Sequence, residues 1–140
     1  QYSVLSKEMI NAYKKTNYEV FTEQPFTLNI DIFSERLSLI YKENSVETAC
    51  FITAYNPFSE KLTLEDNKAF QEKLLQNIIH SGNQFFEGIG VDPKGEWEGE
   101  PSFLILGISK EEAIEKGKQF KQNALVWCNK NCIPQLILLR

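Results

Sequence analysis

Residue types that often carry chemistry are scarce in this 140-residue chain. It contains one histidine, His80, and three cysteines, Cys50, Cys128 and Cys132. One histidine excludes a histidine-based catalytic triad and a multi-histidine zinc site within one chain. A small, odd number of cysteines is a poor disulfide framework and fits a reducing compartment. We therefore expect a cytoplasmic protein with reduced Cys128 and Cys132, no bound metal and no cofactor.

Long apolar runs, linkers and a strong excess of one charge are also missing. The densest apolar runs, residues 49–55 and 103–108, are far shorter than the roughly 18 residues that a membrane-spanning helix needs. No repeat and no Gly/Ser/Pro-rich linker divides the chain, so we expect one domain over residues 1–140. Fifteen basic and nineteen acidic residues give a net charge of −4, which argues against duplex DNA as a partner. Neither a membrane nor a nucleic acid is expected.

Hydrophobic periodicity predicts an α+β protein. From residue 49 the predicted order is strand, helix, strand, strand, helix, strand (βαββαβ), the split β-α-β pattern of ferredoxin-like domains, with extra strands at both ends. We expect a two-layer sandwich in which helices cover one face of a mixed sheet, and in which strands 49–55 and 103–108 are central and adjacent. The predicted strands are residues 18–21, 26–32, 49–55, 84–91, 103–108, 124–128 and 135–139.

Two segments weakly indicate phosphate or RNA binding. Gly88 and Gly90 lack the third glycine and the following helix of a phosphate-binding loop, so close packing of their strand is the favoured interpretation. Residues 116–140 hold five basic residues, no acid, and the aromatic residues Phe120 and Trp127. The aromatic-rich pattern of the RNA-recognition module is missing, which leaves RNA binding as the weaker alternative.

Uncharged polar residues and one carboxylate lie beside the predicted strand ends. Asn56 follows the strand 49–55, Glu100 and Ser102 precede the next buried strand, and Gln122 and Asn123 precede the strand 124–128. Side chains of these types either satisfy backbone groups at strand ends or form hydrogen bonds to a small ligand. Both interpretations stay open at this point.

These residues also carry a resemblance to a known family. The segments FITAYNPFS (51–59), EPSFLILG (100–107) and QNALVW (122–127), with Asn67 between the first two, resemble the small bacterial proteins of domain-of-unknown-function family number 3293. The likeness extends from about Tyr13 to the C-terminus and implies no activity, substrate or catalytic residue. The positions that carry it are Asn56, Pro57, Asn67, Glu100, Pro101, Ser102, Gln122, Asn123 and Trp127.

Our leading hypothesis is a small bacterial cytosolic domain that binds a polar small molecule or a nucleotide-like ligand. Catalysis is not required for this function. If chemistry occurs, Glu100 is the carboxylate able to act as general acid or base, and the amides would orient the substrate. The predicted ligand-binding residues are Asn56, Asn67, Ser102, Gln122, Asn123 and Trp127.

The alternative is a protein-protein interaction module. Residues 87–100 contain five acids and one base, and Trp97 lies between Glu96 and Glu98. An exposed tryptophan in a polar loop is typical of a binding hot spot, because its large ring buries much area on a partner. The same loop also fits a solvated acidic turn without a partner.

Overall fold

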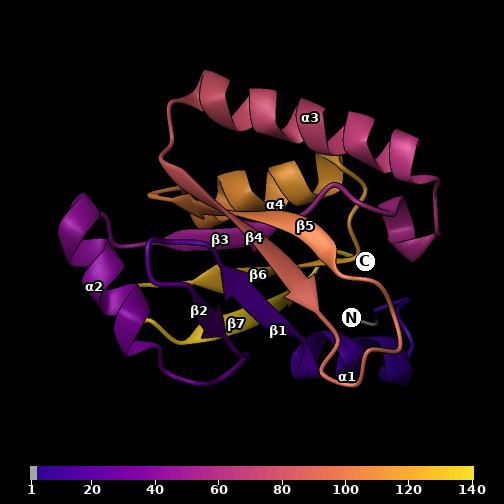
Figure 1. Cartoon of the computed structure of the whole chain (residues 1–140), viewed down its shortest axis with the longest axis horizontal. Coiled ribbons are helices and arrows are strands. Elements are labelled where there is room, and N and C mark those ends of the chain that lie inside the picture. The colour runs from indigo at the N-terminus through magenta and orange to yellow at the C-terminus, as the bar shows by residue number, and fades with distance from the viewer. Residues whose placement is uncertain (1–2) are drawn as a thin grey trace.

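The centre of the protein is a seven-stranded sheet in a computed structural model that describes residues 3–140. The strand order is β2-β1-β4-β5-β3-β6-β7, and every pairing is antiparallel. Figure 1 shows the sheet twisting between helices. The strands are β1 (Asn17–Val20), β2 (Phe26–Leu28), β3 (Ala49–Ile52), β4 (Phe85–Val91), β5 (Glu100–Leu106), β6 (Ala124–Cys128) and β7 (Pro134–Leu138).

Each α-helix of the described chain begins after a serine or threonine whose side chain accepts a backbone N–H of the first turn. Such caps satisfy donors that the helix itself leaves unpaired. None of the helices in residues 3–140 is long and apolar enough to cross a membrane. The helices are α1 (Lys7–Lys15), α2 (Glu35–Asn44), α3 (Leu64–Ser81) and α4 (Lys110–Gln119), and a 3-10 turn spans Pro57–Ser59.

The α+β class is confirmed, whereas the expectation of a mixed sheet is wrong. The crossovers β3–α3–β4 and β5–α4–β6 each join strands that are not neighbours, and an oppositely directed strand fills each gap. Parallel strands therefore do not pair anywhere in residues 3–140. The predicted adjacency of the two apolar strands is confirmed, because β3 and β5 pair in the middle of the sheet with Cys50 opposite Ile105.

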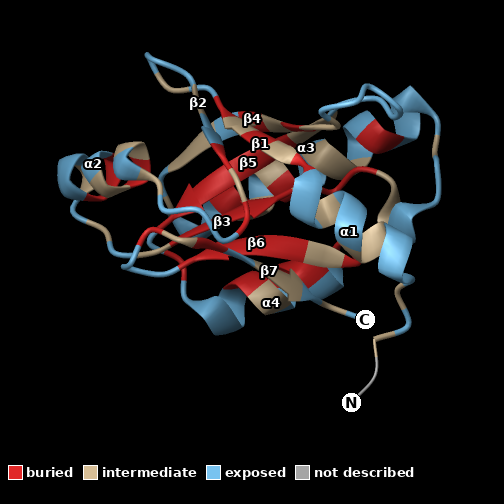
Figure 2. Ribbon diagram, turned by 90° about the horizontal axis from the view of Figure 1, so that it is seen from below, coloured by how far each residue is buried: buried red, intermediate tan, exposed pale blue. Residues whose placement is uncertain are grey.

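Helices cover both faces of the sheet, so the expected placement of all helices on one face is wrong. Alternate side chains of β3 separate into two clusters, because successive strand residues point to opposite faces. Cys50 and Ile52 pack with Leu74 of α3, whereas Phe51 packs in the cluster that contains Leu37 of α2. Figure 2 shows the buried strands enclosed between partly exposed helices.

Close packing explains Gly88, as the sequence indicated. A Cβ atom at this position would lie 2.4 Å from the backbone oxygen of Glu19 and 2.8 Å from Cε2 of Phe51. At Gly90 a Cβ atom would meet only a methyl group of Thr16, at 3.7 Å. The strand pair β1–β4 therefore needs glycine at position 88, where the Phe51 ring lies against the backbone.

Candidate functional site

A cavity of about 860 Å³ opens between α1, the segment that follows β3, and the loop that leads into β5. Its size suits a small organic molecule, since ligand pockets commonly measure about 300–1,000 Å³. The cavity brings together polar residues from four separate parts of the chain. Its lining includes five residues that the sequence pointed to, Asn56, Asn67, Glu100, Ser102 and Gln122.

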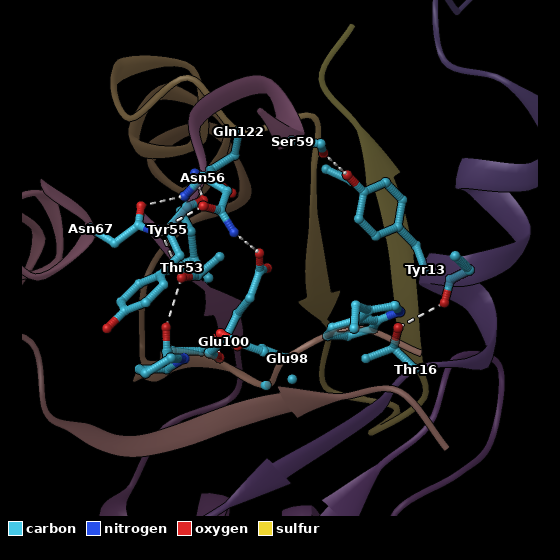
Figure 3. A pocket seen from close by; sticks show the side chains of 18 of the residues that line it. Tyr13, Thr16, Thr53, Tyr55, Asn56, Ser59, Asn67, Glu98, Glu100 and Gln122 are labelled. Atoms are coloured by element: carbon cyan, nitrogen blue, oxygen red, sulfur yellow. Dashed lines mark hydrogen bonds between the residues drawn. The ribbon is translucent and has the colours of Figure 1, made fainter. Parts of the chain in front are cut away.

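Asn56 is the hub of a hydrogen-bond network at the wall of this cavity (Figure 3). Its backbone N–H donates to Oδ1 of Asn67 at 2.8 Å, and its Oδ1 accepts from Nδ2 of Asn67 at 2.8 Å and from the Leu62 N–H at 3.0 Å. Its Nδ2 donates to Oε2 of Glu100 at 2.8 Å. One residue thereby joins the end of β3 to α3 and β5.

The backbone around Asn56 is unusual. Asn56, Phe58 and Ser59 all have left-handed conformations, with φ of 46°, 55° and 62°. Asparagine tolerates this region, but phenylalanine and serine adopt it at a cost that surrounding contacts must offset. The Phe58 N–H donates to the Lys121 carbonyl at 2.6 Å, and the Ser59 N–H donates to the Asn56 carbonyl at 2.7 Å. Such strain concentrates at functional sites, which makes this turn a candidate part of one.

Glu100 is the partly buried carboxylate of the cavity. Burial raises its pKa, and the hydrogen bond from Asn56 opposes this rise without cancelling it. Burial disfavours the charged form because a low-dielectric environment solvates an ion poorly. Within residues 3–140 the one side chain that donates to Glu100 is that of Asn56. The carboxylate can therefore accept further hydrogen bonds, or exchange a proton closer to neutral pH than an exposed glutamate would.

The remaining polar side chains of the wall hold backbone groups at strand ends. Gln122 Nε2 donates to the carbonyls of Tyr55 at 3.1 Å and Phe120 at 3.2 Å. Ser102 Oγ donates to the Glu100 carbonyl at 2.9 Å. These bonds agree with the interpretation that polar residues at strand ends satisfy the backbone. They also fix the shape of the wall from which Glu100 projects.

Two of the predicted ligand-binding residues do not line the cavity. Asn123 contacts the lining residue Ser59, since its Nδ2 donates to Ser59 Oγ at 2.7 Å, and its Oδ1 accepts from Arg140 at 3.1 Å. Trp127 is buried in the apolar cluster under α3 and α4. The three residues of β6 that line the cavity are Ala124, Leu125 and Val126, which precede Trp127 at the start of the strand.

The residues of the alternative hypothesis lie at the same cavity. Glu96, Trp97 and Glu98 all contribute to its lining, although each is exposed. Trp97 keeps 37% of its surface accessible. The acidic loop is therefore a rim of the cavity, and the two sets of sequence-predicted residues meet at one place.

Sequence reasoning missed the contribution of α1. Met9, Tyr13 and Thr16 line the cavity, and the Tyr13 hydroxyl shares a hydrogen bond of 2.8 Å with Ser59 Oγ. Figure 3 shows Tyr13, Thr16 and Ser59 across the pocket from Glu100. The sequence feature that could have indicated this contribution is the helical spacing of Met9 and Tyr13, which places both residues on one face of the helix. The spacing alone does not show which part of the protein this face of the helix packs against.

Metal-ligand geometry is absent from the part of the chain that the structure describes. No group of three or more His, Cys, Asp or Glu side chains within residues 3–140 could hold a metal ion. The three cysteines are buried free thiols, and burial raises the pKa of Cys128 to about 12. A thiol with so high a pKa is a poor nucleophile and metal ligand at neutral pH.

Comparison with known proteins gives one family. The model described as "Protein of unknown function (DUF3293)" matches residues 52–125, more than half of the chain. The matched span contains Asn56, Asn67, Glu100 and Gln122, whereas α1 precedes it. No curated protein and no solved structure matches the chain.

Proposed function

The chain belongs to the DUF3293 family of proteins of unknown function, and on that premise we propose that it binds a polar small molecule in the cavity around Glu100. The observation that supports this most is the convergence of polar residues far apart in sequence. Asn56, Asn67, Glu100 and Gln122 come from the turn after β3, α3, β5 and the α4–β6 connection, and all line one cavity. A concave site with a few convergent polar groups is typical of ligand pockets.

In this proposal Glu100 is the anchor of the ligand. Asn56 donates to one carboxylate oxygen of this lining residue, and the other oxygen accepts no hydrogen bond within residues 3–140. A partly buried carboxylate with a raised pKa is also suited to general acid-base catalysis, so Glu100 would be the catalytic group if the ligand is a substrate. A nucleotide-like ligand would offer its base edge to this carboxylate.

We further propose that β3, α3, β4, β5, α4 and β6 form a ferredoxin-like core. The support is the order β4-β5-β3-β6, in which each β-α-β crossover skips one strand. β1, β2 and β7 then extend the sheet on both sides. In this arrangement the cavity lies where the end of β3, the start of β5 and the start of β6 come together under α1.

We place this activity in the bacterial cytoplasm. The support is the odd number of cysteines, together with the burial of all three as free thiols. Localisation of a fluorescent fusion in a bacterial host tests this part of the proposal.

A mass-spectrometric experiment tests ligand binding. The protein is purified from bacterial cells under native conditions, denatured, and the released metabolites are compared among wild type, Glu100→Gln and Glu47→Gln. Glu47 is exposed and lies outside the cavity lining, so its variant controls for the loss of one acid. We expect a released metabolite from wild type and from Glu47→Gln that is depleted in Glu100→Gln.

The outcome also separates binding from catalysis. Turnover of that metabolite by wild type, lost in Glu100→Gln, would identify an enzyme, and stable retention without turnover would identify a binding protein. If neither wild type nor Glu47→Gln retains or converts any cellular metabolite, the proposal is wrong.

A second candidate function is protein binding through the rim. It is favoured by the partial exposure of Trp97, which lies between Glu96 and Glu98. Capture of one defined protein by wild type but not by Trp97→Ala, with no small molecule released, would support this function instead.

A further inference from the structure

The hydrogen-bond donors of the inner wall are already used within the protein. Asn56 Nδ2 donates to Glu100, and Gln122 Nε2 donates to two backbone carbonyls. Thr53 Oγ1 donates to the Pro101 carbonyl at 2.7 Å. A ligand that enters the cavity therefore finds few free donors on this wall.

Acceptors remain open on the same wall. Glu100 Oε1 and Gln122 Oε1 accept no hydrogen bond from residues 3–140, whereas the opposite ends of both groups are engaged. Glu96 and Glu98 add two carboxylates at the rim, and Lys61 is the one basic residue of the lining. An acceptor-rich, acidic cavity favours a ligand that brings hydrogen-bond donors and positive charge.

Aromatic residues line the same cavity as Glu100. Tyr13, Tyr18, Phe51, Tyr55 and Trp97 all belong to the lining. The face of an aromatic ring attracts a cation within about 6 Å, and the attraction strengthens where water is excluded. A carboxylate beside aromatic rings is thus a combination that recognises organic cations through charge and through their carbon bodies.

We propose that the cavity takes a small organic cation whose ammonium or guanidinium group donates to Glu100 while its carbon chain lies against the aromatic residues. This inference rests on the proposed function and specifies the chemical class of its ligand. A phosphate group fits poorly, because Lys61 would be its one basic partner among the lining residues and three carboxylates would repel it. A nucleotide-like ligand would have to enter by its base rather than by its phosphate.

The test is a panel of small compounds sorted by charge. Agmatine, putrescine and arginine methyl ester represent cations, N-butylurea and butanediol neutral molecules, and butyrate and adenosine monophosphate anions. Affinities are measured by isothermal titration calorimetry on wild type, Glu100→Gln and Glu47→Gln. We expect measurable binding of at least one cation and none of the anions.

Glu100→Gln is expected to weaken cation binding roughly 10- to 100-fold, because a charge-assisted hydrogen bond is lost while the shape is kept. The amide of this variant retains an oxygen that can accept from Asn56, and circular dichroism checks that the variant folds. Trp97→Ala changes an exposed loop residue and leaves the Asn56 network intact. It should weaken the same cation roughly 2- to 30-fold.

The results distinguish this inference from the proposed function. The cation inference is wrong if the protein binds anionic or neutral compounds and no cations, or if a cation binds wild type and Glu100→Gln equally well. Either result leaves the proposal of small-molecule binding intact. Failure of the whole panel overturns the inference as well. Failure of the panel together with the absence of any released metabolite overturns both.

Discussion

The region of the sheet under α3 and α4 differs in its packing from the region under α1. α3 buries Leu74 and Ile78 completely against the sheet, and α4 buries Ala113. α1 buries none of its residues, and beneath it lies the cavity instead of a packed core. Figure 1 shows α3 and α4 together on one side of the sheet and α1 apart from them.

This difference separates the region that supplies most of the stability from the region that we propose binds a ligand. The region under α3 and α4 is filled with apolar side chains, and burial of such side chains supplies most of the free energy of folding. The region under α1 leaves space and polar groups without filling them, at a cost in packing. A chain that packs one region densely and keeps a hollow in the other has room for a binding site where the hollow is.

The largest expected effect comes from weakening the packed region. Leu74 is fully buried between α3 and the sheet, so Leu74→Ala removes apolar contacts and leaves a void. We expect a loss of about 2–5 kcal/mol in the free energy of unfolding, measured by urea denaturation. Leu64 lies on the same helix but is 61% exposed, so Leu64→Ala is the matched control and should change stability by less than about 0.5 kcal/mol.

Equal effects of the two leucine substitutions would contradict the division into a packed and a hollow region. They would mean that side chains on the exposed face of α3 contribute as much to stability as those on its buried face.

The next effect concerns β4, which pairs with β1 and β5. In Gly88→Ala the new methyl group meets the Glu19 carbonyl and the Phe51 ring, both closer than van der Waals contact allows. We expect a loss of about 1–3 kcal/mol from this overpacking. Gly90→Ala is the control, because its methyl group would have an ordinary contact at 3.7 Å. Stabilities are compared by urea denaturation, and a loss in Gly90→Ala as large as in Gly88→Ala would refute this interpretation of β4.

The buried strands of the packed region could be predicted from the sequence, but the antiparallel direction of their pairing could not. β3 and β5 contain continuous apolar residues, which mark strands buried on both faces. Whether neighbouring strands are parallel depends on which strand fills the gap left by each crossover. That choice is made by the packing of α3 and α4 on the whole sheet, and no local pattern records it.

Only some of the residues that line the cavity could be predicted from the sequence. Asn56, Glu100 and Gln122 stand beside strand ends, and the structure brings them to one cavity. Trp127, which the sequence grouped with these residues, lies in the core and outside the family match over residues 52–125. Its face could not be assigned beforehand, since β6 is apolar on both faces and shows no alternation. The role of Tyr13 depends on where α1 docks, which the spacing of its apolar residues leaves open.

A smaller expected effect is the pH dependence of stability that Glu100 causes in the cavity region. Burial raises the pKa of Glu100 in the folded protein, so the folded state holds this proton more tightly than the unfolded chain does. The stabilising contribution of the proton is complete below the unfolded pKa, and it is lost as pH rises through the folded pKa. Wild type should therefore lose stability relative to Glu100→Gln as pH rises from about 4 to about 8.

This pH effect is measured as the difference between the two urea midpoints across that range, and we expect it to be smaller than the effect of Gly88→Ala. A constant difference would show that the hydrogen bond from Asn56 offsets burial, and a difference that favours wild type at higher pH would show that it outweighs burial.

The smallest effect tests how α1 is held over the cavity. The hydrogen bond between Tyr13 and Ser59 is exposed, and exposed neutral hydrogen bonds contribute little because water competes for both groups. A double-mutant cycle of Tyr13→Phe and Ser59→Ala should give a coupling energy of about 0.5 kcal/mol in stability. Amide hydrogen exchange of α1 should nevertheless become faster in Tyr13→Phe while exchange in α3 is unchanged, because α1 buries no residue and opens independently of the core. Equal acceleration in both helices would mean that α1 and α3 unfold as one unit, and the comparison between a packed region and a loosely covered one would fail.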